Sequence, residues 1–401
     1  MVKEIREEEC LSLKPLWERV FSEDSQEFTD YYFEEKVKRN HAFVIEKDKE
    51  KTGEMMAASI PYEDVAAMLH LSPYNMRLRV GDRFICQEAN YIVGVATQEQ
   101  YRRRGYMRML LEASLSDLYG QGQPFAFLMP ASPKIYEPYQ FVYIYDKKKY
   151  ETNISMQNVK AAGEIFELSS GRWEVALLKE DELSELLPYV NRYLEEHYDV
   201  FMDRDEAYYE TLIKELKVQQ GGIFLVRKEN DGEAPRKIEG YFLHTKEEEK
   251  EDIQEAIFEN TSLIGKAGIL QEKNDQPIIM ARIVDAAAML SLLRLKEPKA
   301  KSERQSKEVV LTIQIEDPII MGNNGLWRCH ISEEEAFIQK CEDDDMKVMC
   351  IVGIDALTSW VFGYREAEGC FSFSEEKEKE KVLTEIERIR VFSHIFINEI
   401  V

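Results

Sequence analysis

Residues 90–115 read "NYIVGVATQEQYRRRGYMRMLLEASL", and three structural signals follow one another in this stretch. The segment 90–97 is apolar and β-branched, which is typical of a buried strand. From Tyr106 onward, apolar residues recur every three or four positions, and this spacing predicts an amphipathic helix. The stretch therefore predicts a buried strand that runs through a short turn into a helix.

The turn places positive charge where a helix favours negative charge. Arg102, Arg103 and Arg104 precede the helix, at the positive end of its dipole, where the first backbone N–H groups have no partner within the helix. Gly105 allows the backbone to approach a ligand closely. A strand, a glycine-containing turn and a helix start form an anion cradle, so the turn is predicted to bind two or three phosphates.

Two common phosphate motifs are excluded, and one other interpretation remains. The turn lacks the G-x-x-x-x-G-K-[ST] sequence of a Walker A loop, and its single glycine does not make a dinucleotide fingerprint. On these residues alone, the alternative is an exposed arginine patch at the start of a helix.

Composition limits the class of protein. At 401 residues the chain is too long for one core, and roughly 150 residues per domain predicts two or three domains. The hydrophobic residues, 44% of the chain, exclude general disorder. The formal net charge of −24 argues against non-specific nucleic-acid binding and favours cationic or neutral small partners.

Location and metal content are predicted from what the sequence lacks. No apolar run approaches the length of a membrane span, and the first residues are charged where a signal peptide is apolar, so a cytoplasmic protein without a membrane partner is expected. The six cysteines are scattered and no H-x-x-x-H pair occurs, which predicts buried or free thiols and no metal site.

The order of predicted elements repeats along the chain. Segments 13–21 and 28–39 have helical periodicity, and segments 41–47 and 55–60 read as strands around a polar turn. The same order starts again near residue 181, without a second arginine turn. We interpret this as an internal duplication whose second copy has lost its ligand site. The predicted domains are residues 1–150, 151–280 and 281–401.

The third region is predicted to mix strands and helices. It opens near residue 278 with a strand that leads into a helix, and the polar stretch 296–308 reads as a solvated loop. Further strands are expected at 309–317, 326–332 and 348–354, and the apolar end "VFSHIFINEIV" is expected to dock on the folded chain rather than fray.

The arginine turn resembles the pyrophosphate loop [RQ]-x-x-G-x-[GA] of the GNAT acyl-CoA-dependent N-acetyltransferases. Arg102, Gly105 and Met107 occupy its three defined positions, and Met107 departs from the usual Gly or Ala. About 30 residues further on, "PASPKIYEPYQFVY" resembles the family segment that ends in Tyr-x-x-x-Gly-Phe, with Gln140 in place of the glycine. The resemblance implies that Tyr136 is the general acid. Without the turn, Tyr136 reads equally well as a core residue with a bonded hydroxyl.

Nearly the whole chain resembles the Eis-type ("enhanced intracellular survival") acetyltransferases, in agreement with the duplication and the opening of the third region. The resemblance implies an α/β (α+β) fold, with tandem GNAT folds around mixed, splayed sheets and a C-terminal domain like sterol carrier protein. The second GNAT-like domain would have no cofactor site. A homo-oligomer is also implied, of which a hexamer is one form.

The resemblance further implies acetyl-CoA as co-substrate and direct acyl transfer in a ternary complex. Main-chain groups of strand residues 95–97 would hold the pantetheine arm and the thioester carbonyl, and the turn would hold the pyrophosphate. The carboxylate of the terminal residue, Val401, would be the general base; the alternative is that the tail only completes a strand. The implied cofactor-binding residues are Val95, Ala96, Thr97, Arg102, Arg103, Arg104, Gly105, Tyr106 and Met107.

The acceptor is the least determined part of the prediction. An acidic protein suits a polycationic amine, such as an aminoglycoside, a polyamine or a lysine-like group. Asp24, Asp30 and Glu34 on the first helices are candidates to line the acceptor site, although such charges are commonly a solvated face. Two alternatives from other classes remain: a non-catalytic acetyl-CoA sensor or scaffold, and a lipid carrier that uses the C-terminal domain.

Overall fold

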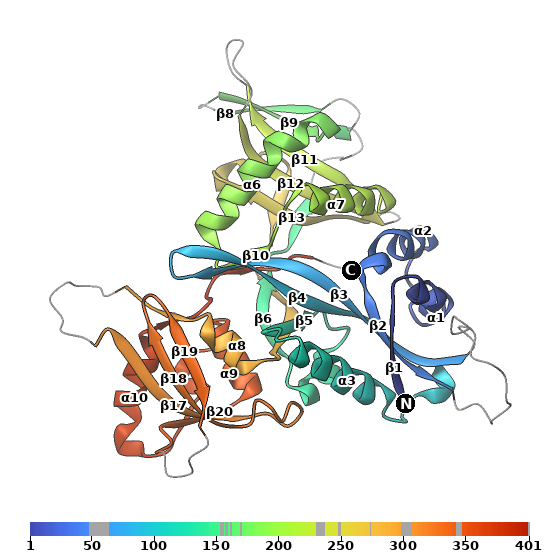
Figure 1. Cartoon of the computed structure of the whole chain (residues 1–401). Helices are drawn as coiled ribbons and strands as arrows, with labels where there is room; N and C mark the ends of the chain where they lie inside the picture. Colours follow the sequence, from blue (N-terminus) through green and yellow to red (C-terminus); the bar gives the residue numbers. More distant parts are fainter. Residues whose placement is uncertain are drawn as a thin grey trace.

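The computed structural model of the chain describes residues 1–47, 64–152, 156, 159–160, 163–168, 171–229, 237–247, 250–272, 274–297, 306–341 and 347–399. Three groups of strands and helices meet around one long central sheet (Figure 1). The strand expected at 55–60 and most of the polar stretch 296–308 lie outside the described residues.

The central sheet has nine strands among the described residues, and its main path runs β1-β2-β3-β4-β5-β15-β6. Two short strands extend it, because β10 pairs with β3 and β23 pairs with β10. The strands are β1 (Val2–Arg6), β2 (His41–Glu46), β3 (Val65–Val80), β4 (Arg83–Thr97), β5 (Phe125–Leu128), β6 (Val142–Lys147), β10 (Val200–Met202), β15 (Gln276–Ile283) and β23 (Ile395–Phe396).

Helices cover both faces of this sheet because its side chains alternate. On β2, Phe43 and Ile45 face the cluster that contains helix α3, whereas Ala42 and Val44 face Trp17 of helix α1. The elements of this first region are η1 (Glu7–Leu13), α1 (Lys14–Val20), α2 (Gln26–Tyr31), the π-helix η2 (Tyr32–Lys36), η3 (Val37–Arg39), η5 (Glu99–Tyr101), α3 (Tyr106–Gly120), α4 (Pro133–Tyr136), η6 (Glu137–Tyr139) and β7 (Tyr150–Thr152).

Strand β15 differs from the predicted organisation. The sequence places this segment at the start of the third region, yet it lies antiparallel between β5 and β6 in the central sheet. Residues 279–283 are buried, as expected of an apolar strand covered on both faces. The third region therefore begins, as a separate layer, after Ile283.

His70 on β3 gives the first testable prediction. The ring is fully buried between Trp17 and Tyr32, and burial lowers its pKa to about 3. An unfolded histidine titrates near 6.5, so the neutral ring stabilises the fold above that pH, and this contribution is lost as the pH falls. From pH 6.5 to 5, we expect the wild type to lose about 2 kcal/mol of unfolding free energy beyond what His70→Gln loses. Urea titrations at both pH values measure the difference, and parallel losses in the two proteins would contradict it.

The second region repeats the element order of the first. Helices α6 and α7 precede strands β11, β12 and β13, as α1 and α2 precede β2, β3 and β4. No long helix follows β13 within the described residues, so this copy lacks a counterpart of α3. The elements are β8 (Glu164–Leu168), β9 (Gly171–Leu177), η7 (Glu180–Glu182), α6 (Leu183–His197), α7 (Glu206–Val218), β11 (Gly222–Lys228), β12 (Ile238–Glu247), β13 (Lys250–Phe258), η8 (Thr261–Leu263) and β14 (Ile269–Gln271).

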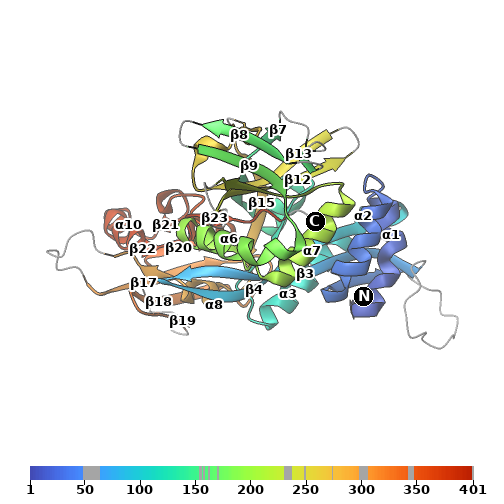
Figure 2. The ribbon, with the colours of Figure 1, turned by 90° about the horizontal axis from the view of Figure 1, so that it is seen from above.

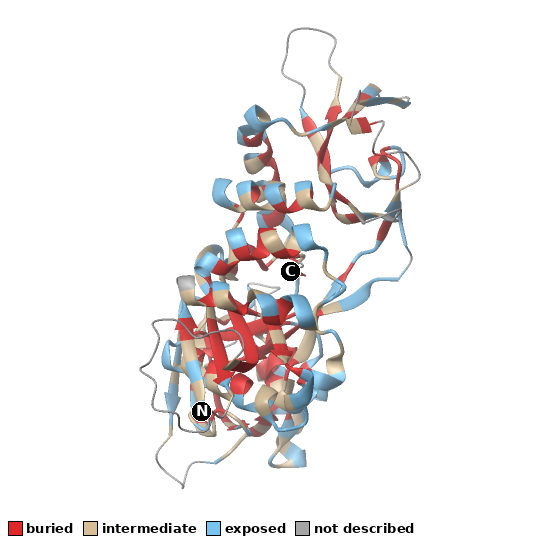
Figure 3. Cartoon of the chain, turned by 90° about the vertical axis from the view of Figure 1, so that its right-hand side faces the viewer, coloured by how far each residue is buried: buried red, intermediate tan, exposed pale blue. Residues whose placement is uncertain are grey.

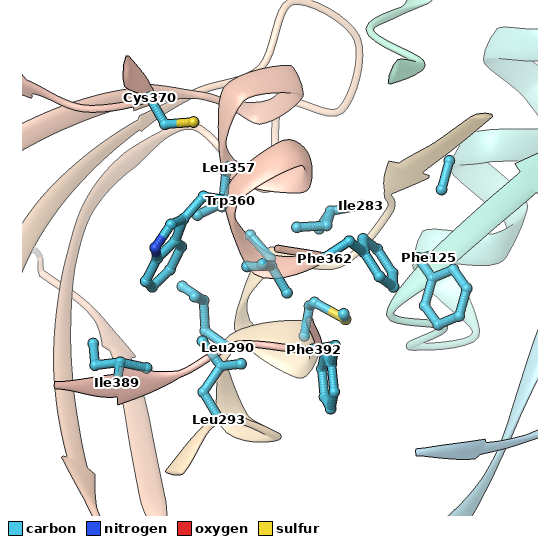
Figure 4. Packing of buried hydrophobic residues seen from close by; sticks show 14 of the residues in the cluster. Phe125, Ile283, Leu290, Leu293, Leu357, Trp360, Phe362, Cys370, Ile389 and Phe392 are labelled. Carbon is cyan, nitrogen blue, oxygen red and sulfur yellow. The ribbon is translucent and has the colours of Figure 1, made fainter. Parts of the chain in front are cut away.

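The third region has a five-stranded sheet in the order β19-β18-β17-β20-β21 with helices packed against it. Its core reaches the central sheet through Phe362, whose ring lies 5.1 Å from that of Phe125 on β5 (Figure 4). The elements are α8 (Ala286–Ser291), β16 (Arg294–Leu295), β17 (Glu308–Glu316), β18 (Gly325–Ser332), β19 (Ala336–Lys340), β20 (Cys350–Gly353), α9 (Ile354–Val361), η9 (Ala367–Gly369), β21 (Ser372–Phe373), η10 (Glu376–Glu378), α10 (Lys379–Glu387) and β22 (Ile389–Arg390).

The last described residues return to the middle of the molecule. Val200 and Phe201 of β10 pair in parallel with Ile395 and Phe396 of β23, which confirms that the apolar tail docks. Buried residues concentrate in the strands that meet there (Figure 3). All six cysteines are free and four of them are buried, as predicted. Among the described residues, no helix is both long and apolar enough to span a membrane.

Candidate active site

Strands β4 and β5 run in parallel but stay paired over only a short length. They pair only through Asn90 with Ala126 and Tyr91 with Phe127. Beyond Tyr91, the edge of β4 that faces β5 has no strand partner within the described part of the chain. Main-chain groups of residues 92–97 on that edge are thus free to bind another molecule.

A bulge in β4 adjusts this edge. The register with β3 shifts between Met68 and His70, opposite Gly94, whose φ is +62°. A Cβ at Gly94 would lie 2.5 Å from the Trp17 ring, so only glycine fits both this backbone and this contact. The bulge redirects the strand just before Val95, Ala96 and Thr97, the predicted pantetheine-binding residues.

The turn after β4 presents an open, uncapped helix start. Arg103 has φ +62° and Gly105 has φ +78°, and no side chain caps the first N–H groups of α3. A Cβ at Gly105 would meet nothing within 4 Å, so space in front of the helix is open and glycine is favoured by its φ alone. A ligand can therefore reach the backbone N–H groups of Tyr106 and Met107.

The three arginines of the turn are exposed and lack carboxylate partners in the described residues. Arg102 Nε is 3.4 Å from the Thr97 carbonyl, and Arg104 lies 5.0 Å above the Tyr101 ring. Arg108, one turn into α3, instead forms a 2.7 Å ion pair with Glu112. Unpaired cations beside unpartnered backbone N–H groups fit a diphosphate.

Tyr136 shares a hydrophobic cluster with the turn and with β4. Val95, Tyr106 and Met107 pack against this cluster, of which Tyr136 is a member, so the fold brings the predicted residues together. The side chain is 9% exposed, and no described residue hydrogen-bonds its hydroxyl. Burial raises the pKa of Tyr136 to about 12, so the hydroxyl remains a proton donor at neutral pH.

Gln140, which stands where the family segment has glycine, adopts the left-handed backbone conformation that glycine favours. Its φ of +66° and ψ of +24° are left-handed, and its N–H donates to Glu137 O at 2.9 Å. The turn that carries Tyr136 back toward the core at Phe141 is thus formed despite the substitution.

An acidic cavity of about 300 Å³ lies between the first and second regions. Ser72 on β3 is one of the residues that line it. Ser72 pairs with Tyr91 on β4, and Tyr91 is the last residue of β4 that pairs with β5. Helices α2 and α7 lie side by side at its rim (Figure 2). Lys36 of the π-helix η2, which continues α2, forms a 2.7 Å ion pair with Glu215 of α7. Two bases, Lys36 and Arg39, line it, and its acids are Glu35, Glu88, Asp203, Asp205, Glu215, Glu255 and Glu399.

The predicted acceptor acids lie elsewhere, Asp24 in the turn between α1 and α2, Asp30 on α2 and Glu34 on η2. Asp24 accepts a 2.8 Å hydrogen bond from Trp17 Nε1, Asp30 pairs with Lys14, and Glu34 is exposed. None of the three is among the residues that line the acidic cavity. Helix geometry explains the difference: Glu35 and Lys36 lie on the face of the π-helix η2 that turns toward α7, and Glu34 does not.

A buried charge network holds the end of the chain against this cavity. Arg204, fully buried, binds Glu255 through two hydrogen bonds of 2.5 and 2.9 Å, and its Nη2 lies 3.5 Å from Glu399. Tyr208 donates to Glu399 at 2.8 Å, and Asn398 Nδ2 donates to Glu255 at 3.1 Å. We call Arg204, Glu255, Asn398 and Glu399 the tail latch. Val401 itself lies outside the described residues.

Sequence reasoning did not find the tail latch. Arg204, Glu255 and the pair Asn398–Glu399 lie far apart in the sequence, Arg204 and Glu255 by 51 positions, and no motif links them. Burial would raise the pKa of Glu255, but the Arg204 charge holds it below its usual value. Burial raises the pKa of Glu399. With one arginine between two carboxylates, the latch carries one excess negative charge beside the cavity when both are ionised.

One cluster of possible metal ligands occurs in the described residues, outside the residues of this site. Single ligand atoms of Glu4, His41 and Asp117 lie within 4.8 Å of one another. Glu4 already pairs with Arg6. The cluster shares no residue with the turn, Tyr136 or the acidic cavity.

Comparisons with known proteins agree with this geometry. Residues 1–144 match the family model of an acetyltransferase (GNAT) domain, and residues 288–390 match that of a sterol carrier protein domain. No curated protein sequence matches the chain.

Several solved structures share the fold over the full length. A GCN5-related N-acetyltransferase from Anabaena variabilis ATCC 29413 aligns with a TM-score of 0.68 at 14% identity, over 100% of both chains. A probable N-acyltransferase from Enterococcus faecalis V583 aligns at 0.65 and 15%, over 98% of this chain and 93% of that one. Eis1 from Mycobacterium abscessus aligns at 0.64 and 12%, over 100% and 99%. The chain therefore carries an acetyltransferase (GNAT) domain at residues 1–144 and a sterol carrier protein domain at residues 288–390, and it shares its overall fold with Eis1 and the other two structures.

Proposed function

We propose that the protein transfers an acetyl group from acetyl-CoA to a primary amine of a small polycationic acceptor. The observation that carries the donor half of this proposal is the turn after β4. Arg102, Arg103 and Arg104, which form no ion pair with the residues that the structure describes, stand beside an uncapped helix start and an open Gly105. This is the arrangement that would fix the pyrophosphate of acetyl-CoA and so position its thioester.

The unpaired edge of β4 supports the placing of the pantetheine arm. Residues 95–97 lie on that edge, between the turn and the point where β4 and β5 separate. An extended arm there would complete main-chain hydrogen bonds that β5 does not make, and a backbone N–H would stabilise the oxyanion of the attacked thioester. Tyr136, from the segment after β5, packs in the same cluster as Val95.

The chemistry would proceed by direct attack in a ternary complex. The neutral amine attacks the thioester carbonyl, a C–N bond forms, and the C–S bond breaks. A carboxylate, for which we propose that of Val401, accepts the proton from the ammonium directly or through water. Tyr136 donates its proton to the departing CoA thiolate and regains one from solvent. Support for the base comes from the tail latch, which holds Asn398 and Glu399 at the acidic cavity.

The charge of the acidic cavity supports a cationic acceptor. Its seven acids outnumber its two bases. Close ion pairs neutralise three of these acids, Glu35 with Lys214, Glu215 with Lys36 and Glu255 with Arg204, and the other four still outnumber Arg39, the remaining base of the wall. The excess negative charge of the tail latch adds to this potential. An amine with several positive charges would be concentrated there, whereas an anionic acceptor would be repelled.

One experiment with two arms tests this proposal. Acetyl-CoA binding is measured by calorimetry, and thiol release is followed with a panel of polyamines and aminoglycosides. We expect Arg103→Ala to weaken acetyl-CoA binding about tenfold, because a charge-assisted phosphate contact is lost. The matched control, Arg108→Ala on the same helix, removes only the exposed pair with Glu112 and leaves binding unchanged.

The turnover arm separates the proposal from its rivals. Thiol release with at least one cationic amine is expected, and residues appended after Val401 should abolish it if the terminal carboxylate is the base. Binding of acetyl-CoA without thiol release by any amine in the panel would favour a sensor or scaffold. Failure to bind acetyl-CoA would exclude the proposed function.

A further inference from the structure

A second cavity of about 300 Å³ lies where the three regions meet, and we call it the junction cavity. Its walls come from residues 144–148 and Tyr150 at the end of the first region, from Tyr193, Tyr198 and 254–256 of the second, and from 362–364, 393–396 and Asn398 of the third. None of the turn residues 102–107 lines it, nor does Tyr136. The junction cavity is thus separate from the proposed acyl-CoA site.

Lys147 at the end of β6 is the buried cation that lines this cavity. The side chain is 8% exposed, and it forms neither an ion pair nor a hydrogen bond with the residues that the structure describes. Burial lowers its pKa, which Asp252, Glu255 and Glu399 only partly offset through space. A buried ammonium without a direct partner is costly, and an anionic ligand would remove that cost.

The polar atoms that accompany Lys147 are mostly hydrogen-bond donors. The hydroxyls of Tyr145, Tyr150 and Tyr198 have no hydrogen-bond partner in the described part of the chain. Burial raises the pKa of all three, so each stays protonated and can donate. The wall's carboxylates are already engaged: Asp146 accepts from Tyr364 at 2.7 Å, and Glu255 is held by Arg204.

Aromatic rings form the apolar part of the wall. Phe396 packs against Tyr198 at 4.8 Å and Tyr145 at 6.2 Å between ring centroids, and Phe362 closes the side toward the third region. Rings arranged around a cavity of this size favour a flat, apolar ligand body of modest size.

We propose that the junction cavity binds a small organic anion with a flat apolar body, an aromatic carboxylate in chemical class, whose carboxylate pairs with Lys147 and accepts from the tyrosine hydroxyls. The binding mode resembles that of other small-molecule sites, in which an aromatic wall holds the body and a few polar groups fix its orientation. The site does not depend on the proposed acetyl transfer, since it shares no residue with the turn or with Tyr136.

The junction cavity and the acidic cavity share part of their lining. Gln254, Glu255 and Asn398 line both the junction cavity and the acidic cavity, so the tail latch is the partition between them. A ligand in the junction cavity would contact the same tail segment, residues 393–398, that leads to the acidic cavity.

Calorimetry of the full chain with naphthalene-2-carboxylate tests the proposal, with the neutral naphthalene-2-carboxamide as the comparison ligand. The wild type should bind one carboxylate per chain, at least about tenfold more tightly than the carboxamide, since the charge-assisted pair forms only with the acid. Lys147→Met keeps the side-chain length and removes the charge, so it should reduce carboxylate affinity to that of the carboxamide. Tyr198→Phe, which removes one hydroxyl and little volume, should weaken carboxylate binding by a smaller factor.

The matched control is Lys149→Met, the same substitution at an exposed lysine that does not line the junction cavity, which should leave carboxylate affinity unchanged. Saturating acetyl-CoA should also leave it unchanged, because the sites are separate. Equal carboxylate affinity in the wild type and Lys147→Met, or displacement of the carboxylate by acetyl-CoA, would overturn the proposal. Circular dichroism and acetyl-CoA affinity of each variant report whether the fold and the donor site are intact.

Discussion

Replacing Tyr136 with phenylalanine is expected to lower kcat by about 10²- to 10⁴-fold while the affinity for acetyl-CoA stays the same. The substitution removes only a hydroxyl that no described residue hydrogen-bonds, so the hydrophobic cluster around the ring remains filled. Without the donor, the CoA thiolate leaves unprotonated. Steady-state kinetics with the best amine of the panel, together with calorimetry, measure both quantities.

Tyr139→Phe is the matched control for this prediction. Tyr139 lies three residues further along the same segment, is only half-buried, and contributes its carbonyl, not its hydroxyl, to a contact with Arg282 Nε at 2.9 Å. Its loss should leave kcat within about twofold. Because the pKa of Tyr136 is about 12, its hydroxyl stays protonated up to about pH 10. Deprotonation of Tyr136 should therefore not lower the kcat of the wild type below that pH. A kcat of Tyr136→Phe equal to that of the wild type would exclude the general-acid role.

Replacing Arg204 with methionine is expected to cost about 3 to 5 kcal/mol of unfolding free energy. The substitution leaves the carboxylates of Glu255 and Glu399 buried side by side without their shared counter-ion. Methionine fills most of the volume, so the loss reports charge rather than a cavity. We also expect the chain segment that contains Glu399 to detach, because without Arg204 the carboxylates of Glu399 and Glu255 repel each other.

The measurement should resolve both effects. Urea titration gives the global change, and hydrogen exchange of the amides of residues 394–399 reports the tail without requiring a two-state transition. Arg192→Met is the control, since Arg192 pairs with Glu259 on the exposed surface and should cost under about 1 kcal/mol. The double variant Arg204→Met, Glu255→Gln should regain part of the stability. Unchanged exchange at 394–399 in Arg204→Met would mean that the latch does not hold the tail.

Local patterns predicted the elements around the turn well. The strand ending at Thr97 and the helix starting at Tyr106 both occur where periodicity placed them. These signals are local, because strand and helix periods and the glycine turn are set by neighbours within a few positions. The docking of the apolar tail was also readable, since a run such as "VFSHIFI" has no other way to leave water.

Other features depended on residues that no local pattern connects. Strand β15 was expected to open the third region, but the free edge between β5 and β6 gave it a place in the central sheet. Asp24, Asp30 and Glu34 are acids on the expected helices, yet a π-helical turn and the packing of α7 brought Glu35 to the cavity.

The sequence by itself determined the proposed donor half of this protein: a strand, an arginine turn with one glycine, a helix start and a tyrosine some 30 residues later, all within one local stretch. Only the tertiary structure decided the proposed acceptor side. The acidic cavity, the tail latch and the junction cavity each join residues from two or three regions. Their charges are specified by which buried groups come to lie within a few ångströms of one another, and that proximity is a property of the packed chain rather than of any segment of it.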